Sequence, residues 1–215
     1  SRQQTANAVK QAPLHFIFHS AYCCSTLLAR ACDIPGVSMG LKEPVMLNDI
    51  MGWKLRGAAT DKMTPALQDI LTILARPFAD NEAVIVKPSN LVNALAPQIL
   101  QMRPDSKAIF LYAPLKDFIG SIARKGMWGR LWARDLMVKQ LRTGMIDLGL
   151  EGDDYLGLTD LQVAAVGWLA QHALFSRICQ ELGPSRIGAI NSARLMKSPE
   201  PALDSIFQHF GLDMD

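Results

Sequence analysis

F-I-F-H-S-A-Y-C-C-S-T-L-L, residues 16–28, is the stretch that decides the fold of this chain. An apolar run ends at a tight turn, and two hydroxyl residues, Ser25 and Thr26, then open a helical pattern. The first backbone N–H groups of a helix have no partner within it, and this end of the helix dipole is positive. A strand, a turn and a helix in this order predict an anion site at the turn. Simple capping of the helix by Ser25 or Thr26 is the alternative.

Composition limits the classes of protein that this chain can represent. Its 215 residues are 49% apolar and 20% charged, with a net charge of +2. This length fits one domain with a substantial core, and the composition excludes wholesale disorder. A nucleic-acid-binding protein would carry a larger basic excess, so no nucleic-acid partner is expected. No apolar run reaches the ~18 residues of a membrane span and no signal peptide is visible, so we expect a cytoplasmic protein without a membrane partner.

The cysteines give no sign of a metal site or of a disulfide scaffold. The chain has four cysteines, Cys23, Cys24, Cys32 and Cys179, and their spacing is not that of metal ligands. Four cysteines are too few for a disulfide scaffold in a chain of this length. We therefore expect reduced thiols and no bound metal. At a helix N-terminus, Cys23 and Cys24 are either thiols of lowered pKa or small packing residues, and packing is the more common role.

Apolar runs without alternation recur along the chain, at residues 14–19, 83–86 and 108–111, and a last short strand is expected at about residues 186–190. Runs of this kind, separated by helical patterns, are typical of strands that are covered on both faces. The chain is therefore predicted to be an α/β protein with a central parallel sheet of four or five strands. Residues 1–13 are expected to form a flexible arm, residues 14–215 a single domain, and residues 14–19 a strand near the centre of the sheet.

The second half of the chain is mostly helical. T-D-L-Q at residues 159–162 predicts a capping box at the start of a helix that ends at Gly183. Residues spaced by three and four are predicted to form the face of this helix that packs on the sheet: Leu161, Ala165, Trp168, His172, Phe175, Cys179 and Leu182. We interpret His172 as a hydrogen-bonded core histidine rather than a catalytic one. A helical cap is expected at about residues 127–157 and a terminal helix at about residues 199–210.

Several segments, taken in this order, resemble the sulfotransferase family of the P-loop nucleotide-binding fold. The quoted stretch looks like the loop that holds the 5′-phosphosulfate of 3′-phosphoadenosine 5′-phosphosulfate. K-E-P at residues 42–44 and V-K-P-S-N at residues 86–90 are similar to segments of bacterial members that line the active cleft. I-F-L-Y-A-P-L-K-D-F-I-G-S-I at residues 109–122 resembles the strand, turn and helix that bind the 3′-phosphate. Residues 190–212 resemble the closing strand and helix.

The resemblance implies a three-layer P-loop fold and transfer of a sulfuryl group from 3′-phosphoadenosine 5′-phosphosulfate to a hydroxyl or amine. Ser121 would hold the 3′ end of this cofactor, and Arg124, one helical turn further, would supply charge. The 5′ end would be held by the residues of the loop, Tyr22, Cys23, Cys24, Ser25 and Thr26. The acceptor would be selected by the cap, whose Trp128 and Trp132 accompany the acidic residues Glu151, Asp153 and Asp154.

The sequence departs from the family pattern at several positions. Tyr22 replaces the lysine of the loop, and Cys24 stands where an ordinary phosphate loop has glycine. Ala113 replaces an arginine at a strand end, and Asn90 stands approximately where many members carry a histidine base. The candidate catalytic residues that remain are a cation, Lys87, which follows a strand at the ligand-binding edge of the sheet, and two possible bases, His19 and Glu43.

Different functions stay open at this point. Besides a sulfotransferase, the sequence allows a family member without catalysis that binds an anion or nucleotide as a regulatory module. A kinase or nucleotide hydrolase is disfavoured because the chain has no G-K-[S/T] sequence. The region 113–142 is the most basic part of the chain, and it is either a solvated helix face or a patch for phosphate or an acidic substrate. Neither the acceptor nor the oligomeric state can be read from the sequence.

Overall fold

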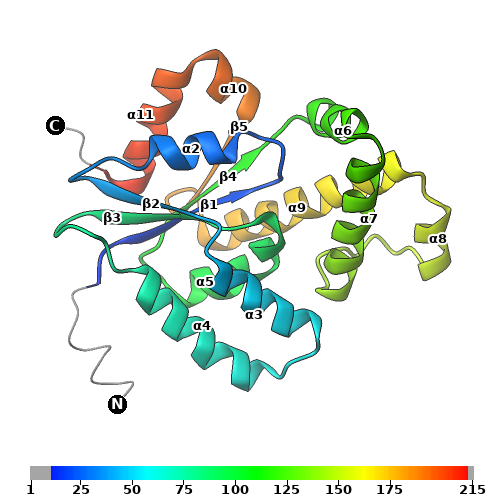
Figure 1. The fold of residues 1–215 in the computed structure, drawn as a ribbon, viewed down its shortest axis with the longest axis horizontal. Coiled ribbons are helices and arrows are strands. Elements are labelled where there is room, and N and C mark those ends of the chain that lie inside the picture. The colour runs from blue at the N-terminus through cyan, green and yellow to red at the C-terminus, as the bar shows by residue number, and fades with distance from the viewer. Residues whose placement is uncertain (1–10, 213–215) are drawn as a thin grey trace.

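The computed structural model of the protein describes residues 11–212. Within this range, five parallel strands form one sheet in the order β2-β3-β1-β4-β5 (Figure 1). The strands are β1 (Leu14–His19), β2 (Ser38–Lys42), β3 (Ala83–Lys87), β4 (Ala108–Tyr112) and β5 (Ile187–Asn191). The predicted α/β class and the central place of residues 14–19 are confirmed. Most of the predicted arm, residues 1–13, lies outside the described residues.

Helices cover both faces of this sheet, so the fold has three layers (Figure 1). The helices of one face are α3 (Val45–Leu55), α4 (Thr60–Leu74), the 3₁₀ helix η1 (Asn90–Leu95), α5 (Ala96–Met102) and the second half of α9 (Asp160–Leu182). Those of the other face are α2 (Ser25–Ala31), α6 (Leu115–Arg124), α10 (Ser192–Lys197) and α11 (Pro199–Phe210).

The central strand β1 explains why the sequence shows an unbroken apolar run. All six of its residues are buried. Successive side chains of a strand point to opposite faces, and here Phe16 and Phe18 join the core on one side while Ile17 joins the core on the other. Because both faces are covered, neither set of side chains meets water, and the alternation of a half-exposed strand is lost.

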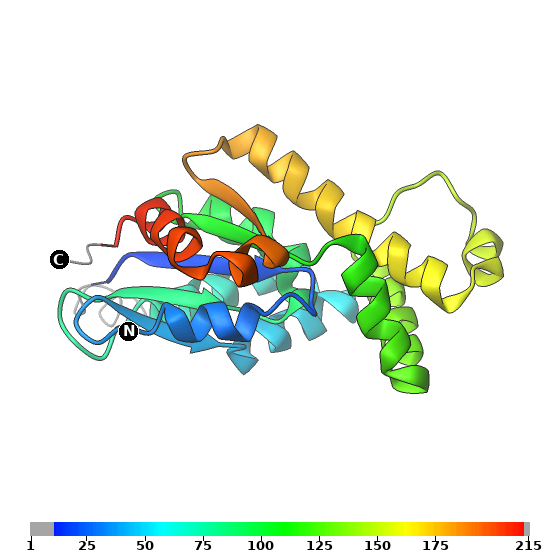
Figure 2. The ribbon, with the colours of Figure 1, turned by 90° about the horizontal axis from the view of Figure 1, so that it is seen from above.

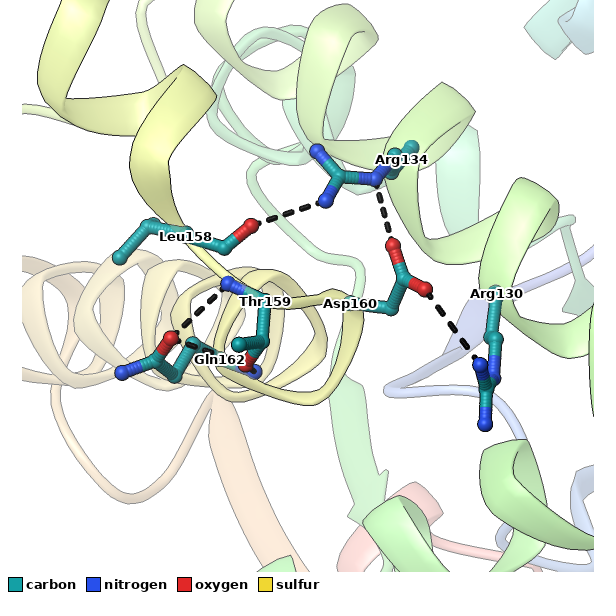
Figure 3. A network of polar contacts seen from close by, with 6 residues as sticks. All are labelled: Arg130, Arg134, Leu158, Thr159, Asp160 and Gln162. Atoms are coloured by element: carbon teal, nitrogen blue, oxygen red, sulfur yellow. Dashed lines mark hydrogen bonds and ion pairs between the residues drawn. The ribbon is translucent and has the colours of Figure 1, made fainter.

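Two helices, α7 (Gly126–Arg142) and α8 (Gly152–Gly157), lie in the range predicted for the cap. They stand at one end of the molecule, beyond the carboxyl edge of the sheet (Figures 1 and 2). Arg134 of α7 fastens this region to the start of α9, because its Nε donates to Asp160 Oδ1 at 2.6 Å and its Nη2 to the Leu158 carbonyl at 2.8 Å (Figure 3). The predicted capping box of Thr159 and Gln162 is confirmed in the same place.

The predicted packing face of α9 is correct only in part. Phe175, Cys179 and Leu182 pack on the core of one sheet face, but of the seven predicted residues Phe175 alone is fully buried. The prediction left out a glycine and a polar residue, Gly167 and Gln171, both of which are buried. Gly167 lies against α7, where an added Cβ would stand 3.1 Å from Gln140 Oε1. The buried residues of α9 are Val163, Ala164, Gly167, Ala170, Gln171, Leu174, Phe175 and Ile178.

Gly129, near the start of α7, gives a test of how closely α7 packs against the end of α6. A Cβ on Gly129 would lie 2.3 Å from the Ile122 carbonyl oxygen and 3.0 Å from Lys125 Cβ. We expect Gly129→Ala to lower the free energy of unfolding by about 1–3 kcal/mol, because backbone atoms must move to admit the methyl group. Urea unfolding measures this. The matched control is Gly152→Ala, where no atom lies within 4 Å and helix propensity alone predicts a neutral or slightly stabilising change. Equal stability of the two variants would contradict the expectation.

Candidate active site

The carboxyl ends of the strands bring the predicted site residues to one edge of the sheet. His19 at the end of β1 is in register with Leu111 of β4, and Lys42 at the end of β2 is in register with Lys87 of β3. In open α/β sheets this is the edge at which ligands bind. The loop after β1 and the segments 42–44 and 86–90 therefore meet here, as the resemblance implied.

The loop after β1 exposes backbone N–H groups rather than capping its helix. Ala21, Tyr22 and Cys24 have positive φ angles of 72°, 51° and 61°, which side-chain-bearing residues rarely adopt. The N-cap residue of α2 is Cys24, which makes no side-chain capping bond, so capping by Ser25 or Thr26 is wrong. Within residues 11–212, the N–H groups of Tyr22, Cys24 and Thr26 have no backbone or side-chain acceptor. Such runs of free N–H groups form concave sites for anions.

Two buried amide side chains hold the carbonyl groups at the start of this loop. Asn93 Nδ2 donates to the His19 carbonyl at 3.0 Å and to Gln171 Oε1 at 2.9 Å. Gln171 Nε2 in turn donates to the Ser20 carbonyl at 3.4 Å, and both side chains are fully buried. Ser20 adds a link to β4, since its Oγ accepts from the Ala113 N–H at 3.2 Å. We call Asn93, Gln171 and Ser20 the loop clamp.

His19 holds the same turn with both nitrogens of its ring. Its Nδ1 accepts from the Ala21 N–H at 3.1 Å, so its Nε2 carries the proton and donates to the Pro88 carbonyl at 3.1 Å. Burial, and then the charge of Lys87, lower the pKa of His19 to about 3. The ring is therefore neutral at neutral pH and has no free lone pair in this arrangement. Action of His19 as a base would require the turn to open.

Lys87 and Glu43 form an ion pair at the edge of the sheet. The side chain of Lys87 is only 2% exposed, and its Nζ donates to Glu43 Oε1, whereas the Glu43 side chain is 53% exposed. The two residues are also joined through the backbone, because the Glu43 N–H donates to the Lys87 carbonyl at 2.7 Å. Glu43 has a φ of 49° directly before Pro44, an unusual conformation for this residue type. Strained backbone of this kind is concentrated at functional sites.

The residues predicted for the 3′ side lie on α6. Ser121 Oγ accepts a hydrogen bond from Arg124 Nη2 at 3.1 Å on an exposed surface. Ala113, which replaces an arginine of the family, is buried, and its carbonyl accepts from Trp168 Nε1 at 2.9 Å. The ring of Tyr22 packs against Phe118 and Trp132, with ring centroids 5.9 and 5.0 Å apart, so it is directed toward the cap.

Two of the remaining candidates, Cys23 and His172, have structural roles. All four cysteines are free. Cys23 is buried, its Sγ donates to the Leu111 carbonyl at 3.3 Å, and burial raises the pKa of this thiol to about 11, which agrees with packing. Cys24 is exposed, so packing does not account for it. His172 is hydrogen-bonded, as predicted, through Nδ1 to the Trp168 carbonyl at 2.9 Å. Across residues 11–212, no group of three or more His, Cys, Asp or Glu side chains is placed to hold a metal ion.

Sequence reasoning missed the loop clamp. Asn93 and Gln171 are 78 residues apart, and no local pattern joins them. One sequence signal could have pointed to these two residues, because each is a polar residue among apolar ones. Asn93 lies within L-V-N-A-L, and Gln171 lies among the apolar residues of α9. A buried amide at such a position must find hydrogen-bond partners, and here the partners are the carbonyl groups of the loop.

Several solved sulfotransferase structures have a similar arrangement of strands and helices. The sulfotransferase domain of the curacin biosynthetic pathway matches with a TM-score of 0.58 at 16% identity, over 97% of this chain and 76% of that one. The chain has the sulfotransferase fold. The sulfotransferase domain of the Synechococcus PCC 7002 olefin synthase matches with a TM-score of 0.57 at 15% identity, over 97% of this chain and 76% of that one.

A third solved sulfotransferase, from Mycobacterium tuberculosis H37Rv, matches with a TM-score of 0.56 at 13% identity, over 99% of this chain and 71% of that one. At these identities the likeness establishes the fold, and activity has to be argued from the site. No protein-family model and no curated protein matches the sequence. Among the described helices, none combines the length and apolar character needed to cross a bilayer.

The buried histidines predict how stability depends on pH. Burial, and then nearby cationic groups, lower the pKa of His15 from 6.5 to about 4, and the pKa of His19 is about 3. The unfolded chain takes up these protons near pH 6.5, before the folded chain does, so the free energy of unfolding falls as the pH falls from about 6.5 toward 3. Each histidine contributes about 1.4 kcal/mol per pH unit in its window.

Denaturant unfolding between pH 8 and pH 4 measures this dependence. We expect His19→Asn, which keeps an acceptor for the Ala21 N–H, to unfold more easily at pH 8 and to lose about half of the acid sensitivity. A wild-type stability that stays constant between pH 6.5 and 4.5, or a variant with an unchanged slope, would contradict the buried neutral ring.

Proposed function

We propose that this protein is a sulfotransferase that transfers a sulfuryl group from 3′-phosphoadenosine 5′-phosphosulfate to a hydroxyl or amine acceptor. The observation that carries the proposal is the position of Lys87, a buried ammonium at the carboxyl edge of a sulfotransferase fold. The charge of Lys87 helps to lower the pKa of His19, the last residue before the loop that follows β1. The ammonium group is therefore close enough to this loop to act on a charge there.

The loop residues fit the 5′ end of the cofactor. Residues 16–28 contain no carboxylate, and the N–H groups of Tyr22, Cys24 and Thr26 have no partner within the described chain. The hydroxyl groups of Ser25 and Thr26 stand at the same helix start and add donors. When bound, 3′-phosphoadenosine 5′-phosphosulfate supplies the sulfuryl group. The loop binds anionic oxygen atoms by N–H donation, which is stronger to a charged acceptor than to a neutral one.

Lys87 and Glu43 fit the two chemical tasks that remain. Transfer of a sulfuryl group, like that of a phosphoryl group, needs stabilisation of the oxygen that leaves. Tyr22 cannot supply a positive charge at the lysine position of the loop, and burial raises the pKa of its hydroxyl further. Lys87 supplies the cation instead. Glu43 accepts the proton of the attacking hydroxyl or amine, because its carboxylate is half-exposed and reachable by an acceptor.

The 3′ end of the cofactor fits the pair of Ser121 and Arg124. The family arginine is absent at Ala113, but the guanidinium of Arg124 is hydrogen-bonded to Ser121 Oγ and lies exposed on α6. A charged contact of this kind contributes about 1.5–3 kcal/mol to the binding of a phosphate group. Arg124 therefore replaces the missing charge from a position one helical turn further along the chain.

A binding module without catalysis is the second candidate, and two observations favour it. His19 uses both ring nitrogens to hold the turn, and Asn90, near the expected position of a histidine base, cannot accept a proton at neutral pH. In this case the loop would bind the nucleotide, and the ion pair of Lys87 and Glu43 would serve the structure of the edge alone.

Substitution of Lys87 separates the two functions. We expect Lys87→Met to lower the rate of sulfuryl transfer at least about 10²-fold, while the affinity for adenosine 3′,5′-bisphosphate changes less than about tenfold. Transfer is measured with radiolabelled cofactor against a panel of phenols, alcohols and amines, and affinity by isothermal titration calorimetry. The control is Lys42→Met, the exposed neighbour in register, which should leave both quantities unchanged.

Three results would contradict the proposal, each in a different part. Wild-type binding without transfer to any acceptor of the panel would establish the binding module. Transfer that survives Lys87→Met would remove this lysine from the mechanism. Absence of binding to adenosine 3′,5′-bisphosphate at millimolar concentration would contradict both candidates.

A further inference from the structure

Lys125 brings a positive charge to the loop after β1 from another part of the chain. Its Nζ lies 5.5 Å from the centroid of the Tyr22 ring. A cation at this distance is attracted by the negative charge on the face of an aromatic ring. Lys125 separates α6 from α7, and these two helices meet beyond the carboxyl edge of the sheet (Figures 1 and 2). The ammonium group therefore stands one ring away from the backbone of residue 22.

The Tyr22 ring is itself held by two aromatic residues of the same helices. Its centroid is 5.9 Å from that of Phe118, which is buried on α6, and 5.0 Å from that of Trp132 on α7, in an edge-to-face contact. Contacts of this kind fix the direction of a ring. A lysine side chain is flexible by itself, and here a fixed ring restrains its charged end.

The charge of Lys125 is not neutralised by a carboxylate. Other basic residues of α7 are paired, since Arg134 forms an ion pair with Asp160 and Lys139 with Asp135. Lys125 is exposed and forms no ion pair with any residue from 11 to 212. An ammonium group has three N–H donors and no acceptor. The contact with the Tyr22 ring uses none of these donors as a conventional hydrogen bond, so they can bind an anion.

We propose that Lys125 supplies the positive charge that binds the 5′-phosphate group of the nucleotide at the loop after β1, with the Tyr22 ring as its positioning residue. The free N–H groups of Tyr22, Cys24 and Thr26 are neutral donors, and the lysine expected in this loop is replaced by Tyr22. Lys125 and the Tyr22 ring together restore that charge. This inference rests on the proposed function, because it concerns the same nucleotide, and it gives Lys125 a role in binding rather than in the transfer step.

A purely structural role of Lys125 makes a different prediction. Lys125 is the C-cap residue of α6, and a cation at this end of a helix interacts favourably with the helix dipole. In that case its charge would stabilise α6 and would not distinguish one nucleotide from another. A direct contact with the 5′-phosphate acts only on nucleotides that carry this group. The two roles are separated by comparing nucleotides with and without it.

The test measures the affinity for adenosine 3′,5′-bisphosphate and for adenosine 3′-monophosphate, by isothermal titration calorimetry and by competition. We expect Lys125→Met to lower the preference for the bisphosphate about tenfold, because one charged contact to the 5′-phosphate is lost. The affinity for the monophosphate should not change. Lys125→Arg keeps the charge and should keep most of the preference. The matched control is Lys116→Met, an exposed lysine at the start of α6, which should leave the preference unchanged.

Substitution of the ring tests the positioning role of Tyr22. Tyr22→Leu keeps an apolar side chain against Phe118 and Trp132 but removes the ring face under the ammonium group. In this background we expect the effect of Lys125→Met on the preference to shrink about two- to fivefold, because the lysine is no longer restrained. Tyr22→Phe keeps the ring face, so in that background Lys125→Met should act as it does in the wild type.

Four outcomes would overturn the inference. An unchanged preference in Lys125→Met, in a protein that binds the bisphosphate, would remove Lys125 and leave the proposed function intact. An equal loss of affinity for both nucleotides would assign Lys125 to the stability of α6. A loss in Lys125→Arg as large as in Lys125→Met would show that charge is not what matters. A wild-type protein that binds neither nucleotide would contradict the proposed function as well.

One further outcome separates the inference from the proposed function. A preference that depends on Lys125, in a wild-type protein that transfers no sulfuryl group to any acceptor, would support the role of Lys125. It would also assign that role to the binding module rather than to a sulfotransferase.

Discussion

The structure of the loop after β1 depends on two buried amide side chains. Asn93 and Gln171 donate to the carbonyl groups of His19 and Ser20, and they also bond to each other. With these carbonyl groups held inside the protein, the chain has to reverse over the next few residues. It does so through positive φ angles at Ala21, Tyr22 and Cys24, in a loop that contains no glycine. Hydrogen bonds in the core thus balance the conformational cost of the loop.

The same constraint joins three parts of the chain into one site. Asn93 comes from η1, just after β3, and Gln171 comes from the middle of α9. His19 is bonded to the Pro88 carbonyl, next to Lys87, so the end of β3 is tied to the loop as well. Lys87 is then held by Glu43 from the end of β2. A buried ammonium is costly without a partner, and Glu43 is the residue that makes this position tolerable.

Much of the fold could be predicted from the sequence because its strands are covered on both faces. Residues 14–19, 83–87 and 108–112 show the unbroken apolar runs that this environment demands. The strand β2 was missed because S-M-G-L-K contains no such run. Gly40 of this strand is needed because an added Cβ would stand 2.6 Å from the Ala29 carbonyl oxygen. This requirement comes from the packing of α2 on β2, which the sequence alone does not show.

The meeting of these strand ends could be predicted from the sequence, but the pairings of their side chains could not. The ends of β1 and β3 could be placed at one edge because parallel strands share their direction. The pairing of Lys87 with Glu43 depends on the order of strands, in which β2 and β3 are neighbours, and the sequence alone does not give this order. The role of His19 depends on two partners, Ala21 and Pro88, of which the second is 69 residues away.

A crystal structure of the protein grown with adenosine 3′,5′-bisphosphate tests the central claim most directly, that the loop clamp turns free N–H groups toward an anion. The account predicts that the 5′-phosphate accepts hydrogen bonds from the N–H groups of Tyr22, Cys24 and Thr26, with the Lys87 ammonium at the same end of the nucleotide. A nucleotide bound elsewhere while the loop keeps its conformation, or a loop closed by the protein's own side chains, would contradict it.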